Sequence, residues 1–274
     1  MITERSLPTE ARWRRALRVA GPPSALGLVI LGIWYFVSEV VLDDNRRFLL
    51  RAPHEVVRKG FLDRDNLSEL LSGLGSSARV AFVGLAVAIV IGVALGTLMS
   101  LSKTIERAVF PYAVIVQAMP ILAIVPLIGF WFGYGFSSRV FVCVVVATFP
   151  IVVNTLFGLL SVEPGLHDLF TLAGAPRSVR LRKLMFPAAL PALFAGLRIS
   201  AGLSVIGAIV GDFFFGQGEA GIGQLLKKYA SRLQGEQLLA AVILSSALGV
   251  LVFLAFGWLA RLATGKWSTE TRGN

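Results

Sequence analysis

The sequence predicts an all-α polytopic membrane protein with about six transmembrane helices and a cytoplasmic helix–turn–helix loop. Hydrophobic residues make up 55% of the 274 residues and charged residues only 15%, well below the roughly 25% of a soluble domain. The apolar residues fall in long runs, and a membrane span needs about 20 of them. The charges gather in the short polar segments between these runs, which favours a bilayer over a soluble core.

The apolar runs define the elements in order. Residues 1–24 form a polar, arginine-rich segment that we expect in the cytoplasm, and residues 263–274 form a cytoplasmic tail. The transmembrane domain between them, residues 25–262, contains six expected spans, at residues 25–42, 79–100, 109–132, 139–160, 188–210 and 238–262. The polar segments 43–75 and 212–237 are then extracellular, and the loop 161–186 is cytoplasmic.

The formal net charge of +10 allows two interpretations, nucleic-acid binding or membrane topology. The basic residues lie at the edges of the apolar runs, which favours topology, because Lys and Arg gather in cytoplasmic loops. The anionic neighbours are then membrane lipids rather than nucleic acid. Basic residues are nearly balanced between the two sides, so the orientation depends on the arginine cluster before the first span, which places both termini inside.

Two spans have features of a translocation path. Prolines interrupt the third span, and a proline frees backbone carbonyls that protein or water must satisfy. Small residues recur along the fifth span and allow close helix contact, although packing within the chain explains such a stripe as well. Trp131 also fits an interfacial aromatic belt, and Asp212 also fits a surface cap. The path candidates are Pro120, Pro126, Trp131, Ser204, Gly207, Gly211 and Asp212.

The loop 161–186 has the pattern of a helix, a break and a second helix. Apolar residues recur at helical spacing at Leu166, Leu169, Phe170 and Ala173. Gly174 is expected to end the first helix in a left-handed conformation, Pro176 suits the first turn of the next helix, and Pro187 marks the start of the fifth span. So short a helix is marginal in water, so either the bilayer surface or a soluble partner must cover its apolar face.

This segment resembles the EAA loop of the permeases of binding-protein-dependent ABC importers. That motif is Glu-Ala-Ala, three residues, Gly, nine residues and Ile-x-Leu-Pro. Gly174 and Pro187 match its glycine and proline without a gap, while Asp168 begins the three residues that replace Glu-Ala-Ala. The family's loop docks into a groove on a cytoplasmic ATPase. The resemblance implies that role for Leu166, Asp168, Leu169, Phe170, Ala173, Gly174, Ala175, Pro176, Arg177 and Pro187, which we call the EAA-like loop.

Other segments resemble the nitrate, sulfonate and taurine branch of this family, which also includes permeases for pyrimidine thiamine precursors. They are residues 51–57, 119–135, 149–159 and 207–226. The resemblance implies a multi-pass permease of the bacterial inner membrane that moves a small solute. Its implied partners are cytoplasmic ABC ATPases, a second copy of the permease and an extracytoplasmic solute-binding protein.

Other classes of function have less support. We expect no catalytic residue, cofactor or metal: His54 and His167 fall on opposite sides of the membrane in this topology and cannot share an ion. The phosphate-binding motif GxxxxGK[ST] is absent from the sequence, so ATP hydrolysis requires a separate subunit. The alternative is a proton- or ion-coupled secondary transporter, which needs ionisable residues within its spans. Its candidates, Glu39, Arg198 and Asp212, are expected near span ends.

Overall fold

The computed structural model describes residues 9–43 and 46–265, and every regular element in these ranges is a helix. The first eight residues of the predicted N-terminal segment and most of the predicted tail lie outside the described residues. The chain forms two compact units. One contains the described residues up to Asn66 together with Tyr229–Ala240, and the other contains Leu67–Lys228 and the described residues from Ala241.

The first unit consists of one long helix and several short pieces. The long helix contains most of the first predicted span and ends in a π-helical turn, and Pro53 occupies the first turn of the short helix that follows. Proline suits that position because the first helical N–H groups have no partner within the helix. The elements are α1 (Thr9–Phe36), η1 (Val37–Val41), α2 (Pro53–Glu55) and η3 (Val56–Phe61).

A buried carboxylate joins the parts of this first unit. The side chain of Glu236, near the start of α11 (Gly235–Thr264), is only 6% exposed. Its Oε1 lies 2.7 Å from Nζ of Lys59 and 3.3 Å from Nε of Arg51. A buried charge is costly unless it is paired, so these two cations hold residues 51–59 against the start of α11.

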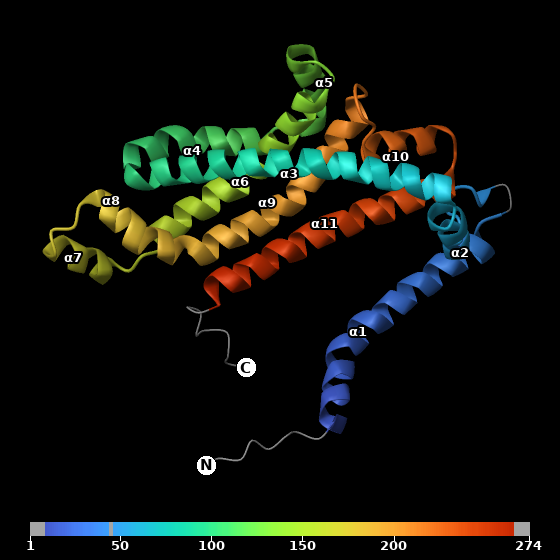
Figure 1. The fold of residues 1–274 in the computed structure, drawn as a ribbon, viewed down its shortest axis with the longest axis horizontal. Helices are drawn as coiled ribbons and strands as arrows, with labels where there is room; N and C mark the ends of the chain where they lie inside the picture. Colours follow the sequence, from blue (N-terminus) through green and yellow to red (C-terminus); the bar gives the residue numbers. More distant parts are fainter. Residues whose placement is uncertain (1–8, 44–45, 266–274) are drawn as a thin grey trace. The chain divides into compact units, whose positions relative to one another are not determined.

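The second unit contains the other long helices (Figure 1). The helix of the second predicted span begins well before residue 79, within the segment predicted to be polar and extracellular, and is longer than expected. In chain order the elements are α3 (Arg64–Leu101), α4 (Lys103–Ala118), α5 (Ile121–Phe132), α6 (Phe136–Leu160), α7 (Pro164–Leu172), α8 (Arg177–Arg180), η4 (Leu181–Met185), α9 (Phe186–Phe214), α10 (Ile222–Ser231) and α11. The first residues of α3 and α11 and the last of α10 belong to the first unit.

The centre of the second unit is the packing of α6 against α9, which lie side by side (Figure 1). Glycines make this close approach possible. A Cβ on Gly207 would lie 2.9 Å from Cα of Cys143, and one on Gly196 would lie 2.7 Å from Cβ of Asn154. Lipid provides no hydrophobic drive for helix association, so backbone contact of this kind contributes much of the packing energy.

The third predicted span is not one helix. α4 and α5 meet at a bend of 100°. Met119 is extended, with ψ of 133°, and Pro120 follows it as the residue that caps α5. A residue before proline is disfavoured in the helical region, which is consistent with a break at this point. Pro111 and Pro126 lie inside continuous helices, so the proline alone does not determine where the span breaks.

The fifth predicted span also differs from expectation. Helical backbone runs through α8, η4 and α9 from Arg177 to Phe214, so Pro187 does not mark the start of the helix. The π-helical turn of η4 ends just before Pro187. Proline has no N–H to donate, and a single π-helical turn within a helix changes the hydrogen-bonding pattern locally without ending the helix. Within the described chain, five helices are long and apolar enough to span a membrane, or six if α4 and α5 form one span.

Candidate functional site

The turn of the EAA-like loop depends on Gly174. Its φ is +65°, and a Cβ there would meet no atom within 4 Å. Glycine is therefore favoured here because it tolerates the left-handed backbone conformation, and not because a side chain would clash. The N–H of Gly174 donates to the carbonyl of Thr171, and that of Ala175 donates to the carbonyl of Phe170, both at 3.0 Å. This pair of bonds is a Schellman motif, so the left-handed end predicted for α7 is present.

A hydrogen-bonded brace connects the two helices of this loop. Nη2 of Arg180 on α8 donates to Oγ1 of Thr171 on α7 at 2.9 Å, and that hydroxyl donates to the carbonyl of His167 at 2.8 Å. Together these two hydrogen bonds connect α7 and α8 across the turn at Gly174. Its other predicted residues are exposed or half-buried, namely Asp168, Ala173, Ala175, Pro176, Arg177 and Pro187.

The apolar face of α7 divides into two parts. Phe170 packs against a cluster of buried residues of this chain, Leu159, Val162, Leu184, Met185 and Ala189. Leu166, Leu169 and Leu172 are 43%, 58% and 88% exposed. The sequence pattern places Phe170 on the docking face, and the structure shows it half-buried against this cluster, because helical periodicity identifies an apolar face but not what covers it. A role for Phe170 in docking stays a prediction. Leu172 was not predicted, although it continues the three-residue spacing of the other two leucines.

The predicted path residues form two separate groups. Pro120, Pro126 and Trp131 are exposed on α5 and at its start. Ser204, Gly207, Gly211 and Asp212 are buried on one face of α9. A Cβ on Gly211 would lie 3.1 Å from Cα of Arg139. In this conformation the second group therefore contributes to packing against α6.

Asp212 is the centre of a buried polar network near the end of α9. Its Oδ1 accepts a hydrogen bond of 3.0 Å from Nη1 of Arg139, and its Oδ2 accepts one from the hydroxyl of Ser77. Asp212 is fully buried and Arg139 is 2% exposed. The N–H of Ile222 donates to Oγ of Ser77 at 2.8 Å. The Arg139–Asp212 cluster, as we call these residues with Ser77, joins α3, α6, α9 and the start of α10.

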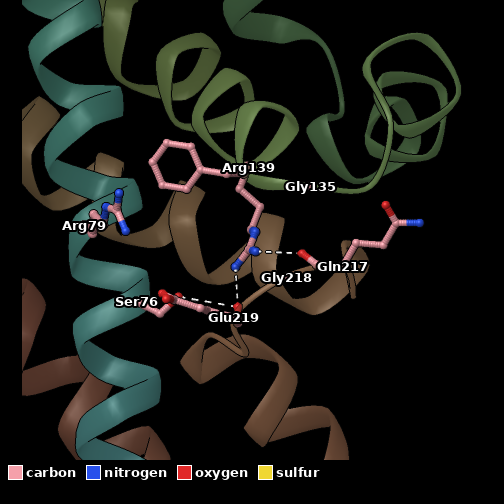
Figure 2. Close-up of a pocket in the computed structure, with 8 residues that line it drawn as sticks. Ser76, Arg79, Gly135, Arg139, Gln217, Gly218 and Glu219 are labelled. Atoms are coloured by element: carbon pink, nitrogen blue, oxygen red, sulfur yellow. Dashed lines mark hydrogen bonds between the residues drawn. The ribbon is translucent and has the colours of Figure 1, made fainter.

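The chain after α9 wraps around the guanidinium of Arg139. Nη2 donates to the carbonyl of Gln217 at 2.9 Å and Nη1 to that of Glu219 at 3.0 Å, as Figure 2 shows. Gly218 between them has φ of +91°. A Cβ on Gly221 would overlap the carboxylate of Asp212. Both glycines are therefore needed for the backbone to approach the ion pair.

An open pocket of about 440 Å³ lies beside this cluster (Figure 2). The guanidinium of Arg79 lies 5.4 Å from the ring centroid of Phe136 on its wall. Asp212 offsets the charge of Arg139, and the remaining charged residues are Arg79 and Glu219. The pocket is thus nearly balanced in charge. Its lining residues are Ser76, Arg79, Gly135, Phe136, Arg139, Gln217, Gly218 and Glu219.

The sequence identified only part of this cluster. The sequence predicts Asp212 as a path residue, but it predicts Arg139 only as the start of a span and gives Ser77 no role. A signal for the ion pair is present in the sequence. Arg139 lies at the start of one apolar run and Asp212 at the end of the next, and antiparallel spans bring such ends together. In the part of the chain that the structure describes, no group of three His, Cys, Asp or Glu residues is placed to hold a metal.

Comparison with known proteins is consistent with this architecture. Residues 88–265 match the family described as binding-protein-dependent transport system inner membrane component. The chain is 34% identical to the formylaminopyrimidine transport permease protein ThiX of Halalkalibacterium halodurans, over 85% of this chain and 90% of the relative. It is 30% identical to the putative aliphatic sulfonates transport permease protein SsuC of Escherichia coli, over 90% of this chain and 91% of the relative.

A solved structure shares the fold. A chain of the MetNI methionine ABC transporter, in an inward-facing conformation, superimposes with a TM-score of 0.65 at 21% identity, covering 74% of this chain and 99% of that one. The family match covers most of the described helices, including the EAA-like loop and the Arg139–Asp212 cluster except Ser77. The chain therefore belongs to the binding-protein-dependent transport system inner membrane component family, the multi-pass permease subunits of ABC importers.

Proposed function

We propose that α7 couples a cytoplasmic ATPase to the spans of this permease, and that the carried solute is a small heterocycle of the pyrimidine type. The coupling proposal rests on one observation: Leu166, Leu169 and Leu172 are exposed on a nine-residue helix whose Phe170 packs, half-buried, against a core cluster. Such a face suits the groove of a partner that binds an amphipathic helix. The ATPases are separate subunits, and a second copy of this chain completes the pore.

The anchor of α7 provides the route for coupling. Phe170 contacts a cluster with residues from the end of α6 and from the helical run leading into α9. α6 and α9 in turn pack along their lengths, with backbone contact at Gly207. A displacement of α7 would therefore move this pair as one body, and transporters commonly switch by rigid-body motion of packed helices.

The Arg139–Asp212 cluster lies at the opposite end of α6 and α9 from the EAA-like loop (Figure 1). With α7 on the cytoplasmic side, the cluster and its pocket face the extracytoplasmic side, where a solute-binding protein delivers its cargo. The cluster fixes the chain after α9 to α3 and α6. It thus gives this surface a defined shape for the binding protein.

The solute class follows from similarity and from charge. The relative named for formylaminopyrimidine transport is 34% identical, and the one named for sulfonates is 30% identical. A carrier of small oxyanions would benefit from unpaired cations at its outer face, whereas Asp212 offsets Arg139 and Glu219 accompanies Arg79. Both observations favour a planar, uncharged or weakly charged heterocycle over nitrate or a sulfonate.

The coupling is tested with Leu169→Asp and Leu172→Asp, because a charge in an apolar interface is costly. Both variants should reach the membrane folded, yet lose co-purification with the ATPase and lose ATP-driven uptake. Glu163→Gln, an exposed change just before α7, is the matched control. Retained ATPase binding and full uptake in both aspartate variants would show that α7 is not the coupling helix.

The solute class is tested by competition during ATP-driven uptake into vesicles that contain the complete importer and its binding protein. Radiolabelled aminopyrimidine should be taken up, and unlabelled taurine or nitrate should not compete. Uptake of taurine in place of the pyrimidine would reject the solute class and leave the permease function intact. Uptake driven by a proton or sodium gradient without ATP would instead support a secondary transporter.

A further inference from the structure

An apolar groove lies between α9 and α11, and Arg198 stacks on Phe253, one of the residues that line it. It has a volume of about 430 Å³, and its walls include Gly202 and Ile206 on α9 and Gly249 and Phe253 on α11. Arg198 precedes Gly202 by one helical turn, and its guanidinium carbon lies 3.8 Å from the ring centroid of Phe253. We propose that an acidic phospholipid of the inner leaflet binds here, with its phosphate on Arg198 and an acyl chain in the groove.

Arg198 has unused hydrogen-bonding capacity. Its Nε is buried without a hydrogen-bond partner, and no carboxylate among the described residues forms an ion pair with it. The face of Phe253 supports the cation, but an aromatic ring is a weaker partner than an anion. A guanidinium presents its donors in a planar fork that matches a phosphate. The missing partner is therefore an oxyanion.

The position of Arg198 along α9 favours the inner leaflet. Asp212 follows Arg198 by 14 residues, about 21 Å at 1.5 Å per residue, whereas the hydrocarbon core is about 30 Å thick. Helical side chains tilt toward the helix N-terminus, which for α9 is the end joined to the EAA-like loop. Arg198 is thus deeper than the span end predicted from the sequence, and its charge extends toward the cytoplasmic headgroups. This orientation rests on the proposed function.

The groove itself is open along its length. A Cβ on Gly202 or on Gly249 would meet no atom within 4 Å, so these glycines leave space that no side chain of the chain fills. The walls are apolar apart from Ser245 and Ser246, whose hydroxyls already donate to carbonyls of their own helix. An acyl chain needs such an apolar channel, and a phospholipid combines that chain with the anion that Arg198 lacks.

The test uses the purified complex of the permease with its ATPase and follows its thermal unfolding as lipid is added. Phosphatidylglycerol should raise the midpoint and phosphatidylcholine should not, because a ligand of the native state stabilises it by mass action. Arg198→Gln should weaken the apparent affinity for phosphatidylglycerol at least tenfold, the loss expected for a charged hydrogen bond. The control Arg261→Gln, an exposed arginine near the end of α11, should change it less than twofold.

A second variant tests the groove without touching the charge. Gly249→Leu places a side chain in open space, so the protein should fold and the affinity for phosphatidylglycerol should fall about tenfold. Equal stabilisation by the two lipids, or unchanged affinity in both Arg198→Gln and Gly249→Leu, would overturn the proposal. The proposal would also fail if a variant kept its lipid affinity but its permease pair dissociated. It would fail too if a variant kept its lipid affinity but lost solute-stimulated ATPase activity in lipid-free detergent. Failure of the coupling function would appear separately, as lost ATPase association.

Discussion

The two ends of the α6–α9 pair are held by opposite kinds of chemistry. At the end joined to the EAA-like loop, a half-buried Phe170 packs on an apolar cluster and leaves three leucines exposed. At the other end, Arg139 and Asp212 are almost fully buried, and both guanidinium Nη atoms and both carboxylate oxygens are hydrogen-bonded. The difference suggests that the first end is built to accept a partner, while the second is built to keep one geometry.

The comparison predicts the largest loss of stability at the Arg139–Asp212 cluster. Arg139→Ala leaves a buried carboxylate without its cation, which typically costs about 3–5 kcal/mol. We expect little folded protein in detergent extracts, measured by size-exclusion chromatography and thermal unfolding. The double variant Arg139→Leu with Asp212→Leu removes both charges and should recover part of the loss. Arg79→Gln, at the exposed wall of the same pocket, should leave stability unchanged, and an equal loss there would contradict the distinction.

Changes in the helix seam should come next. Gly207→Leu places a side chain against the backbone of α6, where even a Cβ would lie 2.9 Å from Cα of Cys143. Overpacking of this kind costs about 1–3 kcal/mol, so the unfolding midpoint should fall. Gly202→Leu, on the same helix with open space at Cβ, is the matched control. Similar midpoints for the two variants would mean that α6 and α9 can separate freely at this point.

Phe170→Ala should cost about 1–2 kcal/mol, less than the 3–5 kcal/mol of a fully buried phenylalanine, because the ring is half-buried. Its larger effect should be functional: the ATPase should still bind through the leucines, while hydrolysis no longer drives uptake. Phe170→Leu should retain most coupling. The measurement is ATP turnover per solute transported, and an unchanged ratio in Phe170→Ala would show that this anchor does not transmit motion.

Gly174→Ala should have the smallest effect on transport of the four, although its cost in stability is similar to that of Phe170→Ala. The added methyl group meets no neighbour, so only the left-handed φ of +65° opposes it, at about 1–2 kcal/mol. Gly174→Asn should be milder, because asparagine tolerates this conformation. ATPase affinity measured by titration should decrease in the order glycine, asparagine, alanine, and an order that followed side-chain volume would point to a steric contact with the ATPase instead.

The sequence predicted the helical class, the number of apolar runs and the left-handed turn at Gly174, because these depend on local composition and local backbone preference. It did not predict the 100° break at Pro120 over the equally plausible Pro111 and Pro126, since the outcome depends on how neighbouring helices support each half. It placed Phe170 with Leu169, although tertiary packing separates them. Arg139 and Ser77 were missed because their partner lies far away in the sequence.

Cys143 shows how the close packing of these helices also affects experiments. Its side chain is fully buried; a Cβ on Gly84 of α3 would collide with that side chain, and one on Gly207 of α9 would crowd the Cys143 backbone. The only thiol in the chain is thus inaccessible to aqueous reagents while the helices stay together. Thiol reagents should therefore leave the unmodified protein unlabelled, so that single cysteines can be introduced without replacing Cys143. A thiol introduced at the exposed Ser68 or Ser178 would report sidedness, and any reaction at Cys143 would report separation of the helices.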